Sequence, residues 1–170
     1  GSGGMLGTDL ALKLASKYEV AGVGRRPVSH LRIPYHTVNL SNSKTTLEFI
    51  LDLKPEAILH AAAMTEVDLC EPERRAALEE NLETTRHVTD AANRLKALVI
   101  YFSTDFVFDG QKSGPYTEED VPHPLSVYGQ TKLLAEKYLR LRGRRYFILR
   151  TSWLFGAYGN NFPKKILKQA

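Results

Sequence analysis

Tyr128 and Lys132 are the residues whose types and spacing point most directly to chemistry in this chain of 170 residues. They stand four residues apart in the string PLSVYGQTKLLAEK, within a helical pattern, so both side chains lie on one helix face. An ammonium group beside a phenol stabilises the phenolate and lowers the tyrosine pKa from its usual value of about 10. Tyr128 is then expected to donate or accept a proton near neutral pH. The same spacing also arises in helices that do no chemistry, so the surrounding residues must decide.

A second polar group, Ser103, Thr104 and Asp105, stands at the end of an apolar stretch in the string YFSTDFVFDG. Doubly wound folds bind their ligands at the carboxyl ends of such buried strands. A hydroxyl group of Ser103 or Thr104 would therefore hold a substrate oxygen beside Tyr128. The alternative is a polar turn at the strand end, capped by Asp105.

The chain opens with glycines at positions 1, 4 and 7 of the string GSGGMLG, just before a helical pattern. Glycines in this arrangement let backbone N–H groups approach a pyrophosphate, whose charge the helix N-terminus favours. A flexible terminus is the alternative, and Gly1 and Ser2 also have the composition of a cloning remnant.

Two arginines, Arg25 and Arg26, follow Gly24 at the end of a short predicted strand. An acidic residue at such a position binds a ribose 2′-hydroxyl, whereas arginine suits a 2′-phosphate. The pair favours NADP over NAD, with a solvated basic turn as the alternative.

Apolar periodicity predicts alternating helices and strands. Helices are predicted over 5–18, 45–53, 73–95 and 127–141, with another beginning near 162, and strands over 19–24, 37–40, 57–62, 98–103 and 146–151. This alternation predicts an α/β fold with a doubly wound parallel sheet, a Rossmann-like NAD(P)-binding fold that here lacks the first strand and the C-terminal substrate domain. We expect residues 1–170 to be a partial NAD(P)-binding domain, with a small substrate domain downstream. The polar segment 109–124 is long enough to be functional or mobile.

Composition excludes several classes of protein. A single cysteine, Cys70, excludes an internal disulfide and favours a reducing compartment, so we expect a cytoplasmic protein. The five histidines lack zinc-ligand spacing, so no metal site is predicted. No apolar run approaches the roughly 18 residues of a membrane span. The net charge of +4 includes an arginine cluster over 140–145 without aromatic residues spaced for base stacking. We expect neither a membrane nor a nucleic acid as partner.

Taken in order, these segments resemble the extended short-chain dehydrogenase/reductase superfamily and, more narrowly, the dTDP-4-dehydrorhamnose reductase family. The most specific strings are STDFVFDG, PLSVYGQTKLLAE and RTSWLFGAYGNNF. GSGGMLG resembles the glycine loop of the family, HAAAMTEVDLCE resembles its stretch after the fourth strand, and Asn81 stands where the family keeps an asparagine.

The resemblance implies a role for each matching residue. The catalytic residues would be Thr104, Tyr128 and Lys132. The cofactor would contact Gly1, Gly4, Met5, Leu6, Arg25, Arg26, Asn39, Leu40, Ala61, Ala62, Ala63, Ser103, Tyr128 and Lys132. The sugar would contact Thr65, Asp105, Phe106, Trp153 and Asn161. Three positions depart from the family pattern, which has tyrosine at Phe106, asparagine at His60 and aspartate at Asn39.

The implied function is reduction of the 4-keto group of a dTDP-4-keto-6-deoxy sugar in dTDP-L-rhamnose biosynthesis. NADP(H) is the preferred cofactor and NAD(H) the alternative; the sugar nucleotide is the expected partner, with a homodimer as the expected assembly. Related dehydratases place Asp-Glu after the threonine, whereas Phe106 follows Asp105 here, which favours reduction. Two other functions stay open: a regulatory subunit on the same scaffold, similar to the β subunit of methionine adenosyltransferase, and a nucleotide-sugar epimerase.

Overall fold

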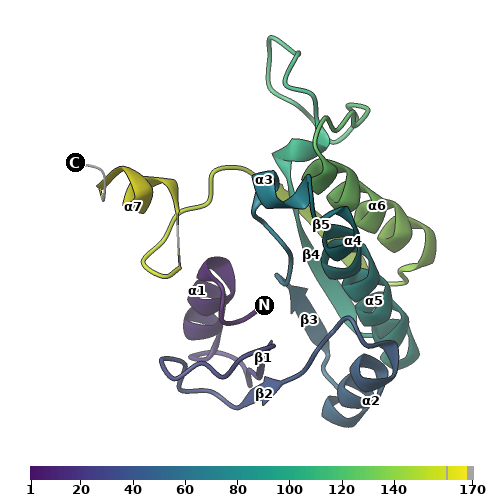
Figure 1. Cartoon of the computed structure of the whole chain (residues 1–170). Coiled ribbons are helices and arrows are strands. Elements are labelled where there is room, and N and C mark those ends of the chain that lie inside the picture. The colour runs from purple at the N-terminus through teal and green to yellow at the C-terminus, as the bar shows by residue number, and fades with distance from the viewer. Residues whose placement is uncertain (160, 168–170) are drawn as a thin grey trace.

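The computed structural model describes residues 1–159 and 161–167 as an α/β structure built on parallel strands. Within these residues the strands form two sheets, one with the order β1-β2 and one with the order β3-β4-β5 (Figure 1). The strands are β1 (Gly22–Gly24), β2 (Tyr35–Thr37), β3 (Ala57–His60), β4 (Leu98–Thr104) and β5 (Tyr146–Thr151). Every pairing is parallel, which confirms the predicted fold class.

The sheet is interrupted between β1 and β3, which are not hydrogen-bonded to each other. In a doubly wound sheet, the strand that leads into the glycine loop stands at this place. None of the described residues fills this place. The start of the chain is anchored to β1 instead, since the Ser2 N–H donates to the Val23 carbonyl oxygen at 3.1 Å.

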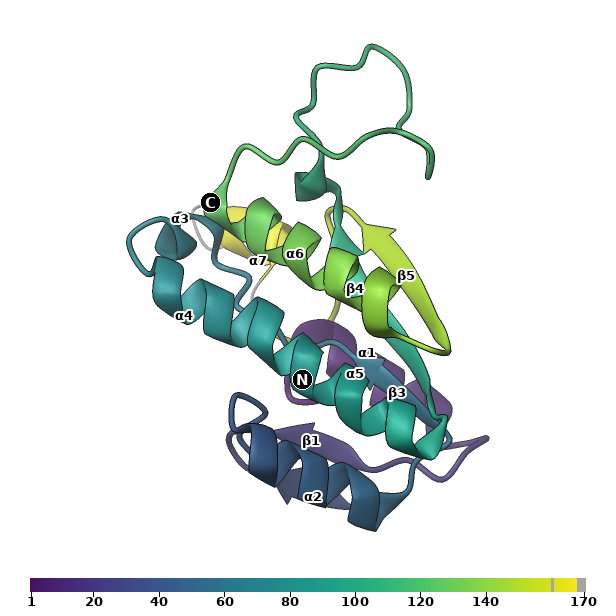
Figure 2. The ribbon, with the colours of Figure 1, turned by 90° about the vertical axis from the view of Figure 1, so that its right-hand side faces the viewer.

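Helices cover both faces of the sheet. The helices are α1 (Met5–Leu14), α2 (Ser43–Leu53), α3 (Val67–Cys70), α4 (Arg74–Leu78), α5 (Thr84–Leu95), α6 (Val127–Arg142) and α7 (Phe162–Leu167). Helices α2, α4, α5 and α6 lie on one face, whereas α1 and α7 lie on the other (Figures 1 and 2). None of the helices in the described part of the chain is long and apolar enough to cross a membrane.

The main core joins α5 and α6 to the central strand β4. Buried residues there alternate along β4, because successive strand residues point to opposite faces. The cluster consists of Ala92, Ala97, Val99, Tyr101, Ala135 and Leu139. This packing places the start of α6 beside the carboxyl end of β4, where the catalytic residues were predicted.

The prediction of one continuous helix over 73–95 is wrong. It begins as α4, passes through a π-helical turn, η1 (Glu79–Glu83), and continues as α5. Such π turns insert one residue into a helix and re-aim its side chains, and they have no signature in apolar periodicity. The short elements α3 and η2, a 3-10 turn at Asp105–Val107, were also not predicted. The first predicted helix ends early, at Leu14 instead of residue 18.

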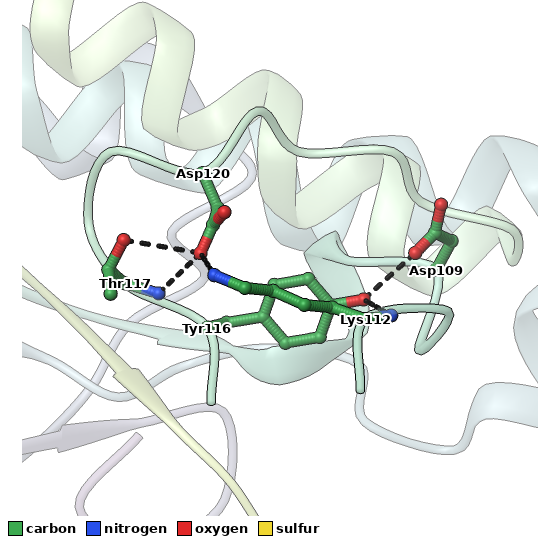
Figure 3. Close-up of polar contacts among 5 residues, drawn as sticks. All are labelled: Asp109, Lys112, Tyr116, Thr117 and Asp120. Atoms are coloured by element: carbon green, nitrogen blue, oxygen red, sulfur yellow. Dashed lines mark hydrogen bonds and ion pairs between the residues drawn. The ribbon is translucent and has the colours of Figure 1, made fainter. Parts of the chain in front are cut away.

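The segment between η2 and α6 is held by its own contacts (Figure 3). The Asp109 carboxylate accepts from the Tyr116 hydroxyl at 2.9 Å, and the Asp120 carboxylate accepts from Lys112 Nζ at 2.7 Å and from the Thr117 N–H at 2.6 Å. We call these five residues the loop network. The loop network connects residues within the segment 109–124, which the sequence predicted to be functional or mobile.

Candidate active site

A cleft of about 480 Å³ opens at the carboxyl ends of β3 and β4, beside the starts of α1 and α6. Parallel strands bring their carboxyl ends to one edge, so segments distant in the sequence meet there. Most of the predicted site residues line this cleft: Gly1, Gly4, Met5, Leu6, Ala61, Ala63, Thr65, Ser103, Thr104, Asp105, Phe106, Tyr128, Lys132 and Trp153. Glu66, Val67 and Thr151 also line it and were not predicted.

The glycine loop forms a close-packed cradle before α1. A Cβ atom on Gly1 would overlap the Ala61 and Ala62 backbone, and one on Gly7 would overlap Gly1. At Gly4, which is exposed, a Cβ atom would meet the Gly1 carbonyl oxygen at 3.4 Å, an ordinary van der Waals contact. Gly4 is also the N-cap of α1, and no side chain caps the helix. Free backbone N–H groups at an accessible helix start fit a pyrophosphate.

Tyr128 and Lys132 lie on one face of α6, as predicted, and that face is buried. They are 9% and 2% exposed, and both line the cleft together with Thr104. The helix begins there because the Ser126 hydroxyl accepts from the Gly129 N–H at 3.1 Å and caps it. Lys132 Nζ donates to the Phe102 carbonyl oxygen at 2.7 Å, which fixes the ammonium group beside the end of β4.

The expected lowering of the Tyr128 pKa is wrong. Burial raises the pKa of Tyr128, while the Thr104 hydroxyl acts in the lowering direction. Burial also lowers the pKa of Lys132 to about 7. Desolvation disfavours the charged form of each group, so it shifts an acid and a base in opposite directions. The sequence spacing showed the proximity of the pair but not its burial.

The two hydroxyl groups considered for the substrate oxygen have different surroundings. The Ser103 hydroxyl donates to the Glu136 carboxylate at 2.6 Å, so it is already engaged on the helix side of the sheet. The Thr104 hydroxyl donates to the Asp105 carboxylate at 3.1 Å and accepts from the Phe106 N–H at 3.2 Å. Of the two, Thr104 is the hydroxyl that can turn toward an oxygen beside Tyr128.

Trp153 and Phe106 form the exposed apolar wall of the cleft. Trp153 is 74% exposed and has a φ of 51°, a left-handed conformation that is strained for a tryptophan. It contacts Phe162 edge-to-face at a centroid distance of 5.3 Å. Phe106 contacts the Tyr128 ring edge-to-face at 5.7 Å. Both rings stand at the cleft, and their roles toward a sugar stay predictions.

The remaining predicted residues lie outside the lining of the cleft. The Arg25 guanidinium pairs with the Glu80 carboxylate, and Arg26 is exposed. The Asn39 side chain accepts from the Ser41 N–H at 3.1 Å. Ala62 is half-buried, and the Leu40 carbonyl oxygen accepts from the Thr46 hydroxyl at 3.1 Å. Their cofactor roles stay predictions.

Asn161, predicted to face the sugar, is used within the chain. Its Nδ2 donates to the Gly156 carbonyl oxygen at 2.9 Å, and its Oδ1 accepts from the Lys164 N–H at 3.2 Å. These bonds shape the turn before α7 and leave its role toward a sugar a prediction.

Asn81 ties α6 to the segment after β3. Its Oδ1 accepts from the Met64 N–H at 2.8 Å, and its Nδ2 donates to the Thr131 hydroxyl at 2.9 Å. The Thr131 hydroxyl in turn donates to the Tyr128 carbonyl oxygen at 2.8 Å. Asn81 lies in the π-helical turn, which explains its inward direction. The family pattern marked the residue, but only the structure gives its contacts.

His60 is a buried neutral group behind the cleft. It is 3% exposed, and its Nε2 lies 3.0 Å from the Thr85 hydroxyl. Burial and the charge of Lys132 lower the His60 pKa to about 3. The imidazole therefore fills, in neutral form, the place where the family pattern has asparagine. Among the described residues, no group of three His, Cys, Asp or Glu side chains has an arrangement that would hold a metal ion.

Comparison with known proteins assigns the chain to a family. The family model described as RmlD substrate binding domain matches residues 1–170. The chain belongs to this family. The dTDP-4-dehydrorhamnose reductase of Aggregatibacter actinomycetemcomitans is 40% identical over 172 residues, with 100% of this chain and 55% of that protein covered.

Solved structures of RmlD-type proteins agree. A hypothetical dTDP-4-dehydrorhamnose reductase from Sulfolobus tokodaii has a TM-score of 0.89 at 35% identity, with 99% of this chain and 59% of that chain covered. The reductase of Bacillus anthracis, crystallised with NADP, has a TM-score of 0.87 at 32% identity, with 99% and 57% covered. The resemblance to the dTDP-4-dehydrorhamnose reductase family is confirmed, and this chain spans about half the length of the relatives it matches.

Proposed function

We propose that the protein carrying this chain is an NADPH-dependent reductase of the 4-keto group of a dTDP-4-keto-6-deoxy sugar, forming dTDP-L-rhamnose. The observation that carries the proposal is that one cleft gathers the glycine cradle with Thr104, Tyr128 and Lys132. Relatives named as dTDP-4-dehydrorhamnose reductases support the substrate.

Thr104, Tyr128 and Lys132 each have a distinct proposed role in the reduction. Bound NADPH supplies the hydride to the ketone carbon. Thr104 holds the ketone oxygen, and Tyr128 donates its phenolic proton to that oxygen as negative charge develops there. The raised pKa of Tyr128 keeps the phenol protonated until then. Lys132, one helical turn away, stabilises the phenolate that the transfer leaves behind.

The cofactor is held by the cradle and by arginine. The Gly4 N–H already donates to the Gly1 carbonyl oxygen at 3.1 Å, so the pyrophosphate fits beside Gly4 at the backbone N–H groups of Met5 and Leu6, and a 2′-phosphate fits Arg25 and Arg26. The NADP complex of the Bacillus anthracis reductase supports this preference, with NAD(H) as the weaker alternative.

The residues 1–170 are proposed to be the partial NAD(P)-binding domain, with a small substrate domain in the rest of the full-length protein. That domain would close the cleft over the sugar, beside Thr65, Trp153 and Phe106. A homodimer and a cytoplasmic location stay predictions.

Replacement of Tyr128 by phenylalanine in the full-length protein tests the proposal. We expect the turnover of dTDP-4-keto-6-deoxy sugar, followed by NADPH absorbance, to fall at least about 100-fold while NADPH still binds. Tyr138→Phe is the matched control, because this tyrosine of α6 points to Asp90 at 2.8 Å. Unchanged turnover in Tyr128→Phe contradicts the proposal.

Two further outcomes point to the other functions. A stoichiometric protein partner without NADPH oxidation favours a regulatory subunit on this scaffold. Tightly bound NAD in the purified protein, with the sugar epimerised and not reduced, favours an epimerase.

A further inference from the structure

Glu136 is a fully buried carboxylate on the catalytic helix, one turn beyond Lys132. Tyr128, Lys132 and Glu136 follow one another at intervals of four residues, so the three side chains share one face of α6. Glu136 is 0% exposed. A buried charge is costly unless other groups compensate it, so its presence here requires an explanation.

Two residues from neighbouring strands compensate this charge. Arg150 of β5 forms a two-pronged pair with Glu136, with Nε at 2.9 Å from Oε1 and Nη2 at 2.6 Å from Oε2. The Ser103 hydroxyl of β4 donates to Oε1 at 2.6 Å. Arg140 lies at the margin, with Nη2 3.8 Å from Oε2 and a side chain that is 53% exposed. We call Glu136, Arg150 and Ser103 the Glu136 cluster.

Within the described residues, the groups that contact the Lys132 ammonium are neutral. Its Nζ donates to the Phe102 carbonyl oxygen at 2.7 Å and lies 4.2 Å from the centre of the Tyr101 ring. A carbonyl dipole and an aromatic face stabilise a cation, but they carry no opposite charge. The carboxylate of Glu136 is the anionic group that the same helix face supplies.

We infer that Glu136 is the counter-charge that favours the ammonium form of Lys132 beside Tyr128, and that Arg150 sets how much of that charge reaches Lys132. This inference rests on the proposed function. Glu136 is thus a positioning residue, since it acts through Lys132 without lining the cleft. A purely mechanical link between α6, β4 and β5 is made at lower cost by apolar residues of similar volume.

The charged and titratable groups around Lys132 agree with this role. From the sheet, His60 of β3 and Tyr101 of β4 face it, and both are buried and neutral, because burial lowers the His60 pKa to about 3 and raises the pKa of Tyr101. From α6, Tyr128 is neutral at rest. Burial lowers the pKa of Lys132 to about 7, and the Glu136 carboxylate acts in the raising direction.

Two charge-removing variants of the full-length protein test the inference by opposite effects. Glu136→Gln removes the anion and leaves the Arg150 cation, so the Lys132 pKa falls. Arg150→Gln removes the competing cation, while Ser103 and Arg140 still contact the carboxylate, so more of its charge acts on Lys132 and the Lys132 pKa rises. The alkaline limb of the pH profile of kcat reports the loss of the Lys132 proton. We expect the midpoint of this limb to fall by on the order of one pH unit in Glu136→Gln and to rise in Arg150→Gln. At pH 7.5 the kcat of Glu136→Gln falls roughly tenfold, and acidic pH restores it.

A charge-conserving variant separates electrostatics from stability. Glu136→Asp keeps the anion but shortens its reach to Arg150, so we expect a lower melting temperature and an alkaline limb within about half a pH unit of wild type. Two results overturn the inference. In one, the alkaline limb of Glu136→Gln has the same midpoint as that of wild type; in the other, it shifts in the same direction as that of Arg150→Gln.

A direct titration distinguishes this inference from the proposed function. The ¹³Cε signal of labelled Lys132 in the same variants reports its pKa without any turnover. If wild type does not reduce the sugar nucleotide, the proposed function fails, while opposite shifts of the Lys132 pKa still support Glu136 as its counter-charge. Equal Lys132 pKa values in wild type and both charge-removing variants overturn the inference even when the enzyme is active.

Discussion

The Glu136 cluster and the loop network are both built around carboxylates, yet their surroundings differ. Glu136 has no exposed surface, whereas the side chains of Asp109 and Asp120 are 27% and 26% exposed. In the loop, hydrogen bonds dominate: those from the Gln111 N–H, His123 and Tyr116 lower the Asp109 pKa to about 2. In the Glu136 cluster, the carboxylate lies in the protein interior, where the dielectric constant is low, so its charge acts on Lys132 with little screening. Exposure therefore separates a carboxylate that orders its own segment from one whose charge acts on another residue.

The two regions are connected through one aromatic ring. The Arg150 guanidinium lies 4.9 Å from the centre of the Phe108 ring, and Phe108 stacks on Tyr116 of the loop network at 4.1 Å. The segment that joins Thr104 to Tyr128 thus rests on the buried cluster. Variants that break one region and spare the other can show whether this contact carries any coupling.

The largest stability effect is expected from Glu136→Ala. It removes the carboxylate and leaves the mostly buried Arg150 cation unpaired, which costs about 3–5 kcal/mol when a buried pair is broken. Urea unfolding of the full-length protein measures it. A loss as small as that of an exposed ion pair would show that water reaches the cluster.

The next effect is expected from His60→Asn in acid. The His60 pKa is about 3 in the folded protein against 6.5 ordinarily, so the unfolded chain binds a proton that the folded one rejects. Stability is therefore lost as the pH falls from 6.5 toward 3. Asparagine does not titrate, so the acid unfolding midpoint of His60→Asn should lie at lower pH. Identical acid midpoints, with similar stability at pH 7.5, would contradict a neutral buried histidine.

The smallest effect on global stability is expected from Asp109→Asn and Asp120→Asn. Exposed charge pairs contribute little, so the melting temperature should change less than in Glu136→Gln. Protease cleavage within 110–124 should nevertheless accelerate, because the loop network no longer holds the segment. In Glu136→Gln the pattern should reverse, with a lower melting temperature and an unchanged rate of loop cleavage in the folded state. Parallel changes in both readouts would show that the regions are coupled through Phe108.

Local pattern predicted a large part of this molecule. The strand over 146–151 and the start of the helix at Val127 were predicted at the observed residues, since apolar periodicity and the Ser126 cap are local features. The π turn was missed because a single inserted residue leaves the periodicity of its neighbours intact. Glu136 was missed although its spacing from Lys132 repeats that of Lys132 from Tyr128 in the same string.

The parallel α/β class, the neighbouring positions of Tyr128 and Lys132, and the membership in a reductase family all follow from the amino-acid sequence. The direction of the Tyr128 pKa shift, the hydrogen bond of Ser103 to Glu136 and the pairing of Arg25 with Glu80 follow from the folded arrangement. Spacing along a helix is local, whereas burial and charge pairing depend on groups that folding brings in from distant segments. Ser103 and Glu136 are separated by 33 residues, and Arg25 and Glu80 by 55.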